Sequence, residues 1–233
     1  MLKAVILAGG LGSRLRPYTY VIPKAMLPIG DKPILEHIIQ NLKRNGVRKF
    51  VLATAYLGKL IEEYFGDGSD FGVEIQYARS KKPLGTGGQL KSAEPWISET
   101  FLAMNGDILI DVNVAKFVQS HRRKRGIGTI ALRHYQLPSK YGVIEVDRSD
   151  RITTWVEKPQ YQLLMNMGFY ALEPEIFSFI KPNLTVSLET ETFPYLIRTG
   201  KRLYGQVIHT EYYDVADVDD LERLERNMSS SGT

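Results

Sequence analysis

Residues 4–17 read Ala4-Val-Ile-Leu-Ala-Gly-Gly-Leu-Gly-Ser-Arg-Leu-Arg-Pro17. The apolar residues at the start of this stretch predict a buried strand over residues 3–8. Three glycines follow, namely Gly9, Gly10 and Gly12. They predict a turn that exposes backbone N–H groups, because a residue without a Cβ lets a ligand approach the main chain closely. A buried strand that leads into such a turn favours an anion-binding site.

Two basic residues near the turn strengthen this interpretation. Arg14 lies inside the turn, and Lys24 follows Pro23 shortly after it. The turn and the two cations together suit a polyanion such as a nucleoside triphosphate. Two other phosphate motifs are excluded. A dinucleotide-binding fingerprint needs a third glycine where Leu15 stands, and the chain contains no G-x-x-x-x-G-K-[ST] loop.

The composition is typical of a soluble enzyme without thiol chemistry. The chain has 233 residues, a net charge of +4 and no cysteine, which excludes disulfides and cysteine nucleophiles and fits a cytoplasmic protein. No apolar run approaches the roughly 20 residues that span a bilayer. Because Met1-Leu-Lys-Ala4 leads directly into the first strand, we expect no signal peptide. The basic run His121-Arg-Arg-Lys-Arg125 is interpreted as the solvated end of a helix rather than a nucleic-acid site.

Hydrophobic periodicity predicts alternating strands and helices in the first half of the chain, as a parallel sheet requires. The expected strands cover residues 3–8, 49–54, 73–77, 101–105 and 129–133, and the expected helices cover residues 33–42, 57–65, 88–96 and 112–124. The second half is expected to contain strands at 143–147, 152–156 and 168–172, helices at 188–199 and 218–227, and a β-hairpin over 203–214. The prediction is therefore an α/β fold, with a Rossmann-like three-layer α/β/α arrangement around a central mixed, mostly parallel sheet.

Further motifs follow the glycine turn along the chain. With the turn, they are Gly9–Pro17, Thr19, Pro23-Lys24, Leu27-Pro28, Lys32-Pro33-Ile34, Pro83-Leu-Gly-Thr-Gly-Gly88, Asn105-Gly-Asp107, Tyr141-Gly-Val143, Glu157-Lys-Pro159, Asn166-Met-Gly168 and Asp214. In this order they resemble the sugar-1-phosphate nucleotidylyltransferases, and most closely the short members without a C-terminal β-helix. No repeat or linker composition divides the chain, so we expect one catalytic domain over residues 1–228, with a nucleotide half at about 1–110 and a sugar half at about 111–228. The small polar residues at 229–233 predict a disordered tail.

The resemblance implies that a sugar-1-phosphate attacks a nucleoside triphosphate and that pyrophosphate leaves. The implied catalytic residues are Arg14, Lys24, Asp107 and Lys158. Mg²⁺ is the implied cofactor, held by Asp107 and Asp214, because this ion also takes phosphate oxygens and water as ligands. Asp217 is a second candidate for the role of Asp214, and the cap of the last helix is its other interpretation.

The resemblance also implies the binding residues. On the nucleotide side they are Leu7, Ala8, Gly9, Gly10, Gly12, Ser13, Ser80, Pro83, Gly85, Thr86 and Gly88. On the sugar side they are Gly142, Glu157 and Asn166. Trp155 lies two residues before Glu157, so strand alternation places both on one face, where Trp155 is either a floor for the sugar or a core residue.

The expected substrates are GTP and mannose-1-phosphate, because Pro83–Gly88 and Ser139-Lys-Tyr-Gly-Val143 look most like their guanylyltransferase counterparts. UTP or dTTP with a hexose-1-phosphate is the alternative. The chain departs from both patterns, because Ser80 stands where the UTP- and dTTP-dependent relatives often have glutamine, and Ser80-Lys-Lys82 replaces the acidic residues usual before the loop proline of the guanylyltransferases. A non-catalytic subunit that binds a nucleotide sugar is an alternative of another class. We expect neither nucleic acid nor a membrane as a partner, and the resemblance is compatible with a homo-oligomer.

Overall fold

A computed structural model describes residues 1–230 of the chain. Its centre is a seven-stranded sheet with the strand order β12-β8-β11-β6-β1-β4-β5. The strands are β1 (Lys3–Leu7), β4 (Lys49–Thr54), β5 (Glu74–Arg79), β6 (Phe101–Asn105), β8 (Gly128–Pro138), β11 (Gln160–Leu172) and β12 (Leu203–Val207). All neighbours pair in parallel except at β11, which runs antiparallel to both β6 and β8. The predicted mixed, mostly parallel sheet is confirmed.

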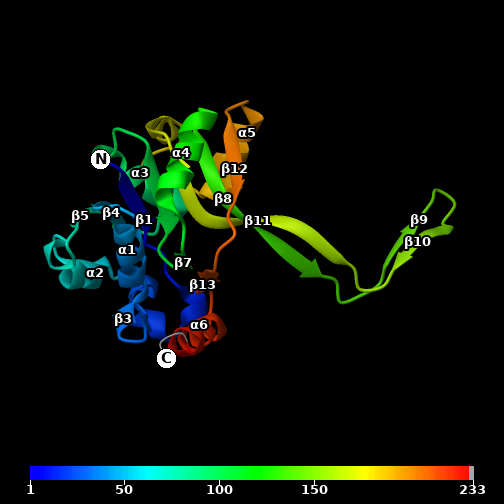
Figure 1. Cartoon of the computed structure of the whole chain (residues 1–233), viewed down its shortest axis with the longest axis horizontal. Coiled ribbons are helices and arrows are strands. Elements are labelled where there is room, and N and C mark those ends of the chain that lie inside the picture. Colours follow the sequence, from blue (N-terminus) through cyan, green and yellow to red (C-terminus); the bar gives the residue numbers. More distant parts are fainter. Residues whose placement is uncertain (231–233) are drawn as a thin grey trace.

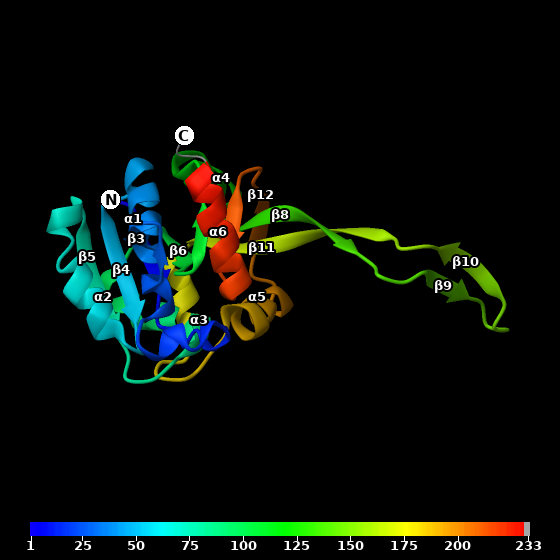
Figure 2. The same cartoon turned by 90° about the horizontal axis from the view of Figure 1, so that it is seen from below.

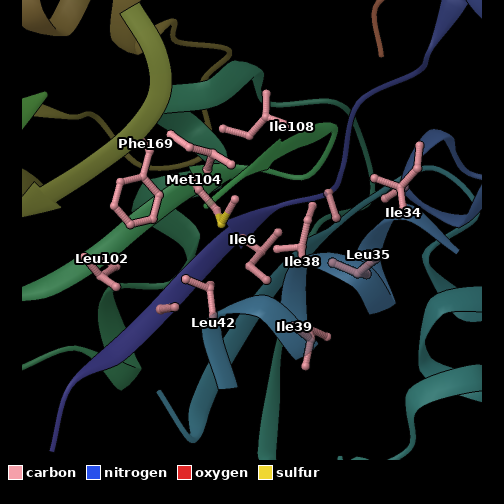
Figure 3. Close-up of a cluster of buried hydrophobic side chains, with 14 of the residues drawn as sticks. Ile6, Ile34, Leu35, Ile38, Ile39, Leu42, Leu102, Met104, Ile108 and Phe169 are labelled. Atoms are coloured by element: carbon pink, nitrogen blue, oxygen red, sulfur yellow. The ribbon is translucent and has the colours of Figure 1, made fainter. Parts of the chain in front are cut away.

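Helices cover both faces of this sheet (Figures 1 and 2). One face carries α1 (Ile34–Arg44), α2 (Gly58–Phe65), α4 (Val114–Lys124) and α6 (Val218–Ser230), and the other carries α3 (Gly85–Ser92) and α5 (Phe193–Arg198). Strand alternation divides β1 between the two cores. Ile6 packs with Ile38 of α1 (Figure 3), whereas Val5 packs in the cluster that contains Leu90 of α3. The three layers follow from this division.

Smaller elements complete the fold. Short strand pairs are formed by β2 (Pro28–Ile29) with β3 (Lys32–Pro33), β7 (Ile108–Ile110) with β13 (Tyr212–Asp214), and β9 (Val143–Val146) with β10 (Ile152–Val156). Short 3-10 helices lie at Ser13–Leu15, Tyr18–Tyr20, Lys24–Met26, Ser69–Phe71, Glu94–Trp96 and Pro174–Phe179, and a π-helical turn lies at Leu188–Thr192. Within residues 1–230, no helix combines the length and apolarity that crossing a membrane requires.

The second half of the chain departs most from the predictions. The hairpin expected over residues 203–214 is wrong, because β12 pairs with β8 and β13 pairs with β7. The strand expected at 168–172 is only the inner end of β11. Of the helix expected at 188–199, the first turn is π-helical and α5 begins at Phe193.

Three smaller corrections concern helices. The helix expected at 88–96 begins earlier, at Gly85, and its last residues form a separate 3-10 turn. His121 was expected in a solvated basic run but is buried on the inner face of α4. Helix α6 extends to Ser230 and so includes the start of the tail expected at 229–233, and residues 231–233 lie outside the described residues.

Candidate functional site

The glycine turn and Asp107 meet at one edge of the sheet. Strands β1 and β6 are parallel neighbours with Leu7 opposite Asn105, so the turn after β1 lies beside Gly106 and Asp107 after β6. The Gly106 N–H donates to the Leu7 carbonyl at 3.0 Å and ties the two loops together. The carboxyl ends of parallel strands are where open α/β sheets bind ligands. The predicted phosphate turn and the predicted metal ligand therefore share one site.

Lys24 connects the two loops electrostatically. Its Nζ lies 2.5 Å from Oδ2 of Asp107, and both side chains are largely shielded from solvent. The lysine belongs to the 3-10 turn that follows Pro23. Because the pair is partly shielded, water screens its attraction less than it screens a surface ion pair. An anionic ligand at this edge would meet a cation that is already in position.

The glycine turn itself is built differently from the prediction at one position. The Gly9 N–H does not face the site, because it donates to Oε1 of the buried Gln89 at 2.7 Å. The expectation of a free amide at Gly9 is therefore wrong. Gly12 has a φ of +59°, and a Cβ there would lie 2.8 Å from the Thr19 side chain, so the turn requires glycine. Gly10 is exposed and borders open space.

Asp214 completes a cluster of four charged groups. It lies on β13 opposite Ile108, the residue after Asp107. Burial raises the pKa of the Asp214 carboxyl, the charge of Asp107 raises it further, and the charges of Lys24 and Arg14 oppose this shift. A second carboxylate close to the first needs a cation to stay ionised.

Asp217 has a different role from Asp214. Its Oδ1 accepts the Asp220 N–H at 3.0 Å, and Asp220 in turn accepts the Ala216 N–H at 3.0 Å. This reciprocal arrangement caps the start of α6. Of the two candidate carboxylates, Asp214 is therefore the one whose charge interacts with that of Asp107, and Asp217 caps a helix.

The donor set at this edge suits a cation that shares its ligands with phosphate. Among residues 1–230, no three His, Asp or Glu side chains gather into a group that could hold a metal by themselves. Asp214 lies on β13, and Asp107 lies in the turn just before β7, the strand that pairs with β13. Mg²⁺ commonly takes one or two carboxylates and fills its remaining positions with water and substrate phosphates. The residues present fit this ion, and its binding stays a prediction.

The second glycine-rich loop packs against protein. A Cβ at Gly85 would lie 2.5 Å from the Val186 carbonyl oxygen, and a Cβ at Gly88 would lie 2.5 Å from the Leu184 carbonyl oxygen. Both glycines thus permit the segment 184–186 to approach the start of α3 closely. Their contact with a nucleotide stays a prediction.

Several other residues expected on the nucleotide side have internal partners. The Ser80 hydroxyl donates to the Lys82 carbonyl at 2.6 Å, and the Thr86 hydroxyl donates to Glu189 at 2.6 Å. The Ala8 N–H donates across to β4. Ser13 and Pro83, by contrast, are exposed at the surface of their loops. The nucleotide contacts expected of these residues stay predictions.

The expected sugar-side residues are divided between two places. Asn166 belongs to the body of the molecule, where its Nδ2 donates to the Tyr170 hydroxyl at 2.9 Å. Gly142, Glu157 and Lys158 lie on a long projection that carries β9 and β10 away from the sheet (Figure 1). A Cβ at Gly142 would lie 2.6 Å from Oε2 of Glu157, so these two residues do meet. They do not meet Asp107 of the same chain.

Two residues near the charged cluster were not predicted. Burial and the charges of Asp214 and Asp107 raise the pKa of the Tyr212 hydroxyl, which places this side chain beside the two carboxylates. The guanidinium of Arg133 lies 5.3 Å from the centre of the Tyr212 ring. Arg133 ends the apolar run Thr129–Leu132 of β8, and a cation at the end of a buried strand is the signal that could have identified it.

Comparisons with known proteins agree with this architecture. The family model described as "Nucleotidyl transferase" matches residues 3–231. The UTP–glucose-1-phosphate uridylyltransferase of Synechocystis sp. is 34% identical over 98% of this chain and 64% of its own length. The mannose-1-phosphate guanylyltransferase of Mycobacterium tuberculosis is 34% identical over 94% of this chain and 62% of its own length.

A solved structure extends the comparison to three dimensions. HddC from Yersinia pseudotuberculosis, crystallised with GMP-PN, superposes with a TM-score of 0.77 at 26% identity, and the match covers 98% of this chain and 100% of HddC. The chain spans less than two thirds of the length of the two curated relatives above. The family model, the sequence identities and the shared fold agree, and the chain belongs to the nucleotidyl transferase family.

Proposed function

We propose that this chain joins a nucleoside triphosphate to a sugar-1-phosphate and releases pyrophosphate. The observation that carries the proposal is the Lys24–Asp107 pair beside the glycine turn, with Asp214 on β13, which pairs with the strand that follows Asp107. Both substrates are polyanions, and this edge of the sheet combines fixed cations with two carboxylates that suit Mg²⁺. The charged groups of the site therefore complement the negative charges of the proposed substrates.

In the proposed reaction, an oxygen of the sugar phosphate attacks the α-phosphorus of the triphosphate. A new P–O bond forms as the bond to the β-phosphate oxygen breaks, and pyrophosphate leaves with that electron pair. The protein supplies position and charge rather than a covalent nucleophile. Arg14 would neutralise the β- and γ-phosphates, and Lys24 would contact the oxygens of the α-phosphate. When bound to Asp107 and Asp214, Mg²⁺ would neutralise further phosphate charge.

GTP and mannose-1-phosphate are the proposed substrates. The similarity to the M. tuberculosis mannose-1-phosphate guanylyltransferase supports this pair. UTP with glucose-1-phosphate is the second candidate, supported by the similarity to the Synechocystis uridylyltransferase, and dTTP with a hexose-1-phosphate completes the set. A non-catalytic nucleotide-sugar-binding subunit is less favoured, because Arg14, Lys24 and Asp107 are all present.

A substrate panel tests the proposal. GTP, UTP and dTTP are each combined with mannose-1-phosphate and glucose-1-phosphate in the presence of Mg²⁺, and pyrophosphate release is measured. We expect the GTP and mannose-1-phosphate pair to be fastest. Chelation of the metal should stop the reaction, and nucleotide-sugar binding without any pyrophosphate release would favour the regulatory alternative.

A matched pair of lysine variants tests the site. Lys24→Met should lower kcat by roughly 10²–10³-fold, because it removes a preorganised cation from the transition state. Lys59→Met is the control, since Lys59 is exposed on α2, where its Nζ lies 3.3 Å from Oε1 of Glu63. Equal activity of the two variants would refute the assignment of Lys24.

A further inference from the structure

A two-stranded ribbon projects from the body of the molecule. Residues 134–164, here called the arm, comprise the outer ends of β8 and β11 and the β9–β10 hairpin (Figures 1 and 2). The other described residues, 1–133 and 165–230, are called the body. The ladder continues without a register shift from His134–Leu164 to Pro138–Gln160, and the Ser139 N–H then donates to the Pro159 carbonyl at 2.9 Å. The outer strand β12 pairs with β8 only as far as Leu132. The arm therefore extends the hydrogen-bond ladder of β8 and β11 beyond the end of β12, as a ribbon of two strands.

The surface of the arm is unusually apolar. Its exposed large apolar side chains are Tyr135, Leu137, Tyr141, Ile144, Val146, Ile152, Trp155, Val156, Tyr161, Leu163 and Leu164. Trp155, one of the two tryptophans of the chain, is 63% exposed. An isolated two-stranded ribbon is marginally stable in water, and monomeric proteins rarely expose apolar surface of this extent. These side chains require a covering surface.

The arm also carries half of the proposed site. Glu157 and Lys158 follow β10, and Gly142 leaves room for the Glu157 carboxylate. At about 3.3 Å per residue, the six steps from Asn166 to Gln160 place the outer end of β11 roughly 20 Å beyond the point where the arm leaves the sheet, and Lys158 lies two residues before that end. Arg14, Lys24 and Asp107 remain in the body. Within one chain, the residues expected to bind the triphosphate are therefore far from those expected to bind the sugar phosphate.

A second copy of the chain satisfies both requirements. The body of the second copy lacks nearby residues to bind the sugar phosphate, and the apolar surface of its own arm also needs to be covered. Twofold symmetry makes the two contacts equivalent, because each arm reaches the body of the other copy. Closure of an arm onto its own body would instead require the ladder between His134–Leu164 and Pro138–Gln160 to bend back or break.

We propose that two copies exchange arms, so that Glu157 and Lys158 of one copy complete the site of the other. This inference rests on the proposed function for the role of the residues but not for the exchange itself. Lys158 supplies a cation for the phosphate of the sugar, and Glu157 accepts hydrogen bonds from sugar hydroxyls. Each active site then contains residues of both chains.

Complementation of two inactive variants tests the exchange. Lys24→Met damages the body and leaves the arm intact, whereas Lys158→Met does the reverse. Random pairing of equal amounts gives half hybrid dimers, each with one undamaged site of two, so about a quarter of the original activity should return. Mixing Lys24→Met with the double variant Lys24→Met/Lys158→Met should restore nothing. Absence of recovery in the first mixture would overturn the proposal.

A crosslinking experiment reports the exchange without any activity. Since the chain has no cysteine, a double variant Arg14→Cys/Lys158→Cys carries thiols only at the body and the arm. A short bifunctional maleimide should convert it to covalent dimers on a denaturing gel. An internally crosslinked monomer, or no crosslink, would overturn the exchange. Covalent dimers from a protein that releases no pyrophosphate would instead refute the proposed function alone.

Discussion

Asp214 and Asp217 are three positions apart, yet the charge of Asp214 disfavours the folded state and that of Asp217 favours it. The Asp214 side chain keeps contact with solvent, but partial desolvation and the charge of Asp107 both raise the pKa of its carboxyl. Its charged form is therefore a cost to the folded state in the absence of a cation. The Asp217 carboxylate accepts a backbone N–H at the start of α6, which favours folding.

Substitution of these two residues should separate activity from stability. Asp214→Asn should reduce pyrophosphate release by at least roughly 10²-fold, with the free energy of unfolding unchanged or increased. Asp217→Ala should retain activity but lose about 1 kcal/mol of unfolding free energy through the missing cap. Urea denaturation and the pyrophosphate assay measure the two quantities. Loss of activity in Asp217→Ala alone would reverse the assignment of the two carboxylates.

Local sequence predicted the glycine turn and its cations but not the partner of the turn. Gly9, Gly12 and Lys24 lie within one short stretch, and a pattern over neighbouring residues suffices to identify them. Gln89 lies eighty residues after Gly9, and its side chain reaches the Gly9 N–H only because α3 packs against β1. Nothing in the sequence around Gln89 indicates that its side chain accepts a hydrogen bond from so distant a donor.

The strands were predicted well where strands and helices alternate along the chain. They were predicted poorly where a strand pairs with one far away in the sequence. The alternating first half follows the rule that parallel strands are joined through helices. Strands β12 and β13 follow each other in sequence and suggest a hairpin, yet their partners β8 and β7 come from much earlier in the chain. The outer part of β11 has apolar residues exposed to solvent, so burial could not define its length.

Helix α4 carries a buried histidine that links stability to pH. The His121 ring nitrogens lie 2.9 Å from the Thr129 hydroxyl and 3.0 Å from Glu173 Oε1. Burial lowers the pKa of His121 below its ordinary value of 6.5, although the neighbouring Glu173 opposes this shift. Below that ordinary value the unfolded chain therefore binds a proton that the folded protein does not.

Acidification should consequently destabilise the protein through His121. The free energy of unfolding should fall as the pH drops through 6.5, and the fall from this group ends below the lowered pKa of the folded state. His121→Gln should flatten this part of the pH profile, whereas His209→Gln, at an exposed position, should not. Urea unfolding at a series of pH values provides the measurement. Equal profiles for the two variants would show that His121 does not carry the effect.

Body and arm differ in what stabilises them. Two apolar clusters, one on each face of the sheet, contain the buried large side chains of the body. The arm has exposed apolar residues and its own ladder of backbone hydrogen bonds. A single chain therefore gains its folding free energy in the body, and the arm gains stability only when another surface covers it.

Two aromatic truncations measured at two protein concentrations separate these contributions. Phe169→Ala removes a buried ring that packs 5.2 Å from the Phe117 ring and should cost about 3–5 kcal/mol at any concentration. Trp155→Ala should cost less than about 0.5 kcal/mol in dilute solution, where copies separate. At high concentration it should cost more, because association stabilises only the covered arm. A large, concentration-independent loss in Trp155→Ala would mean that the arm packs against its own chain.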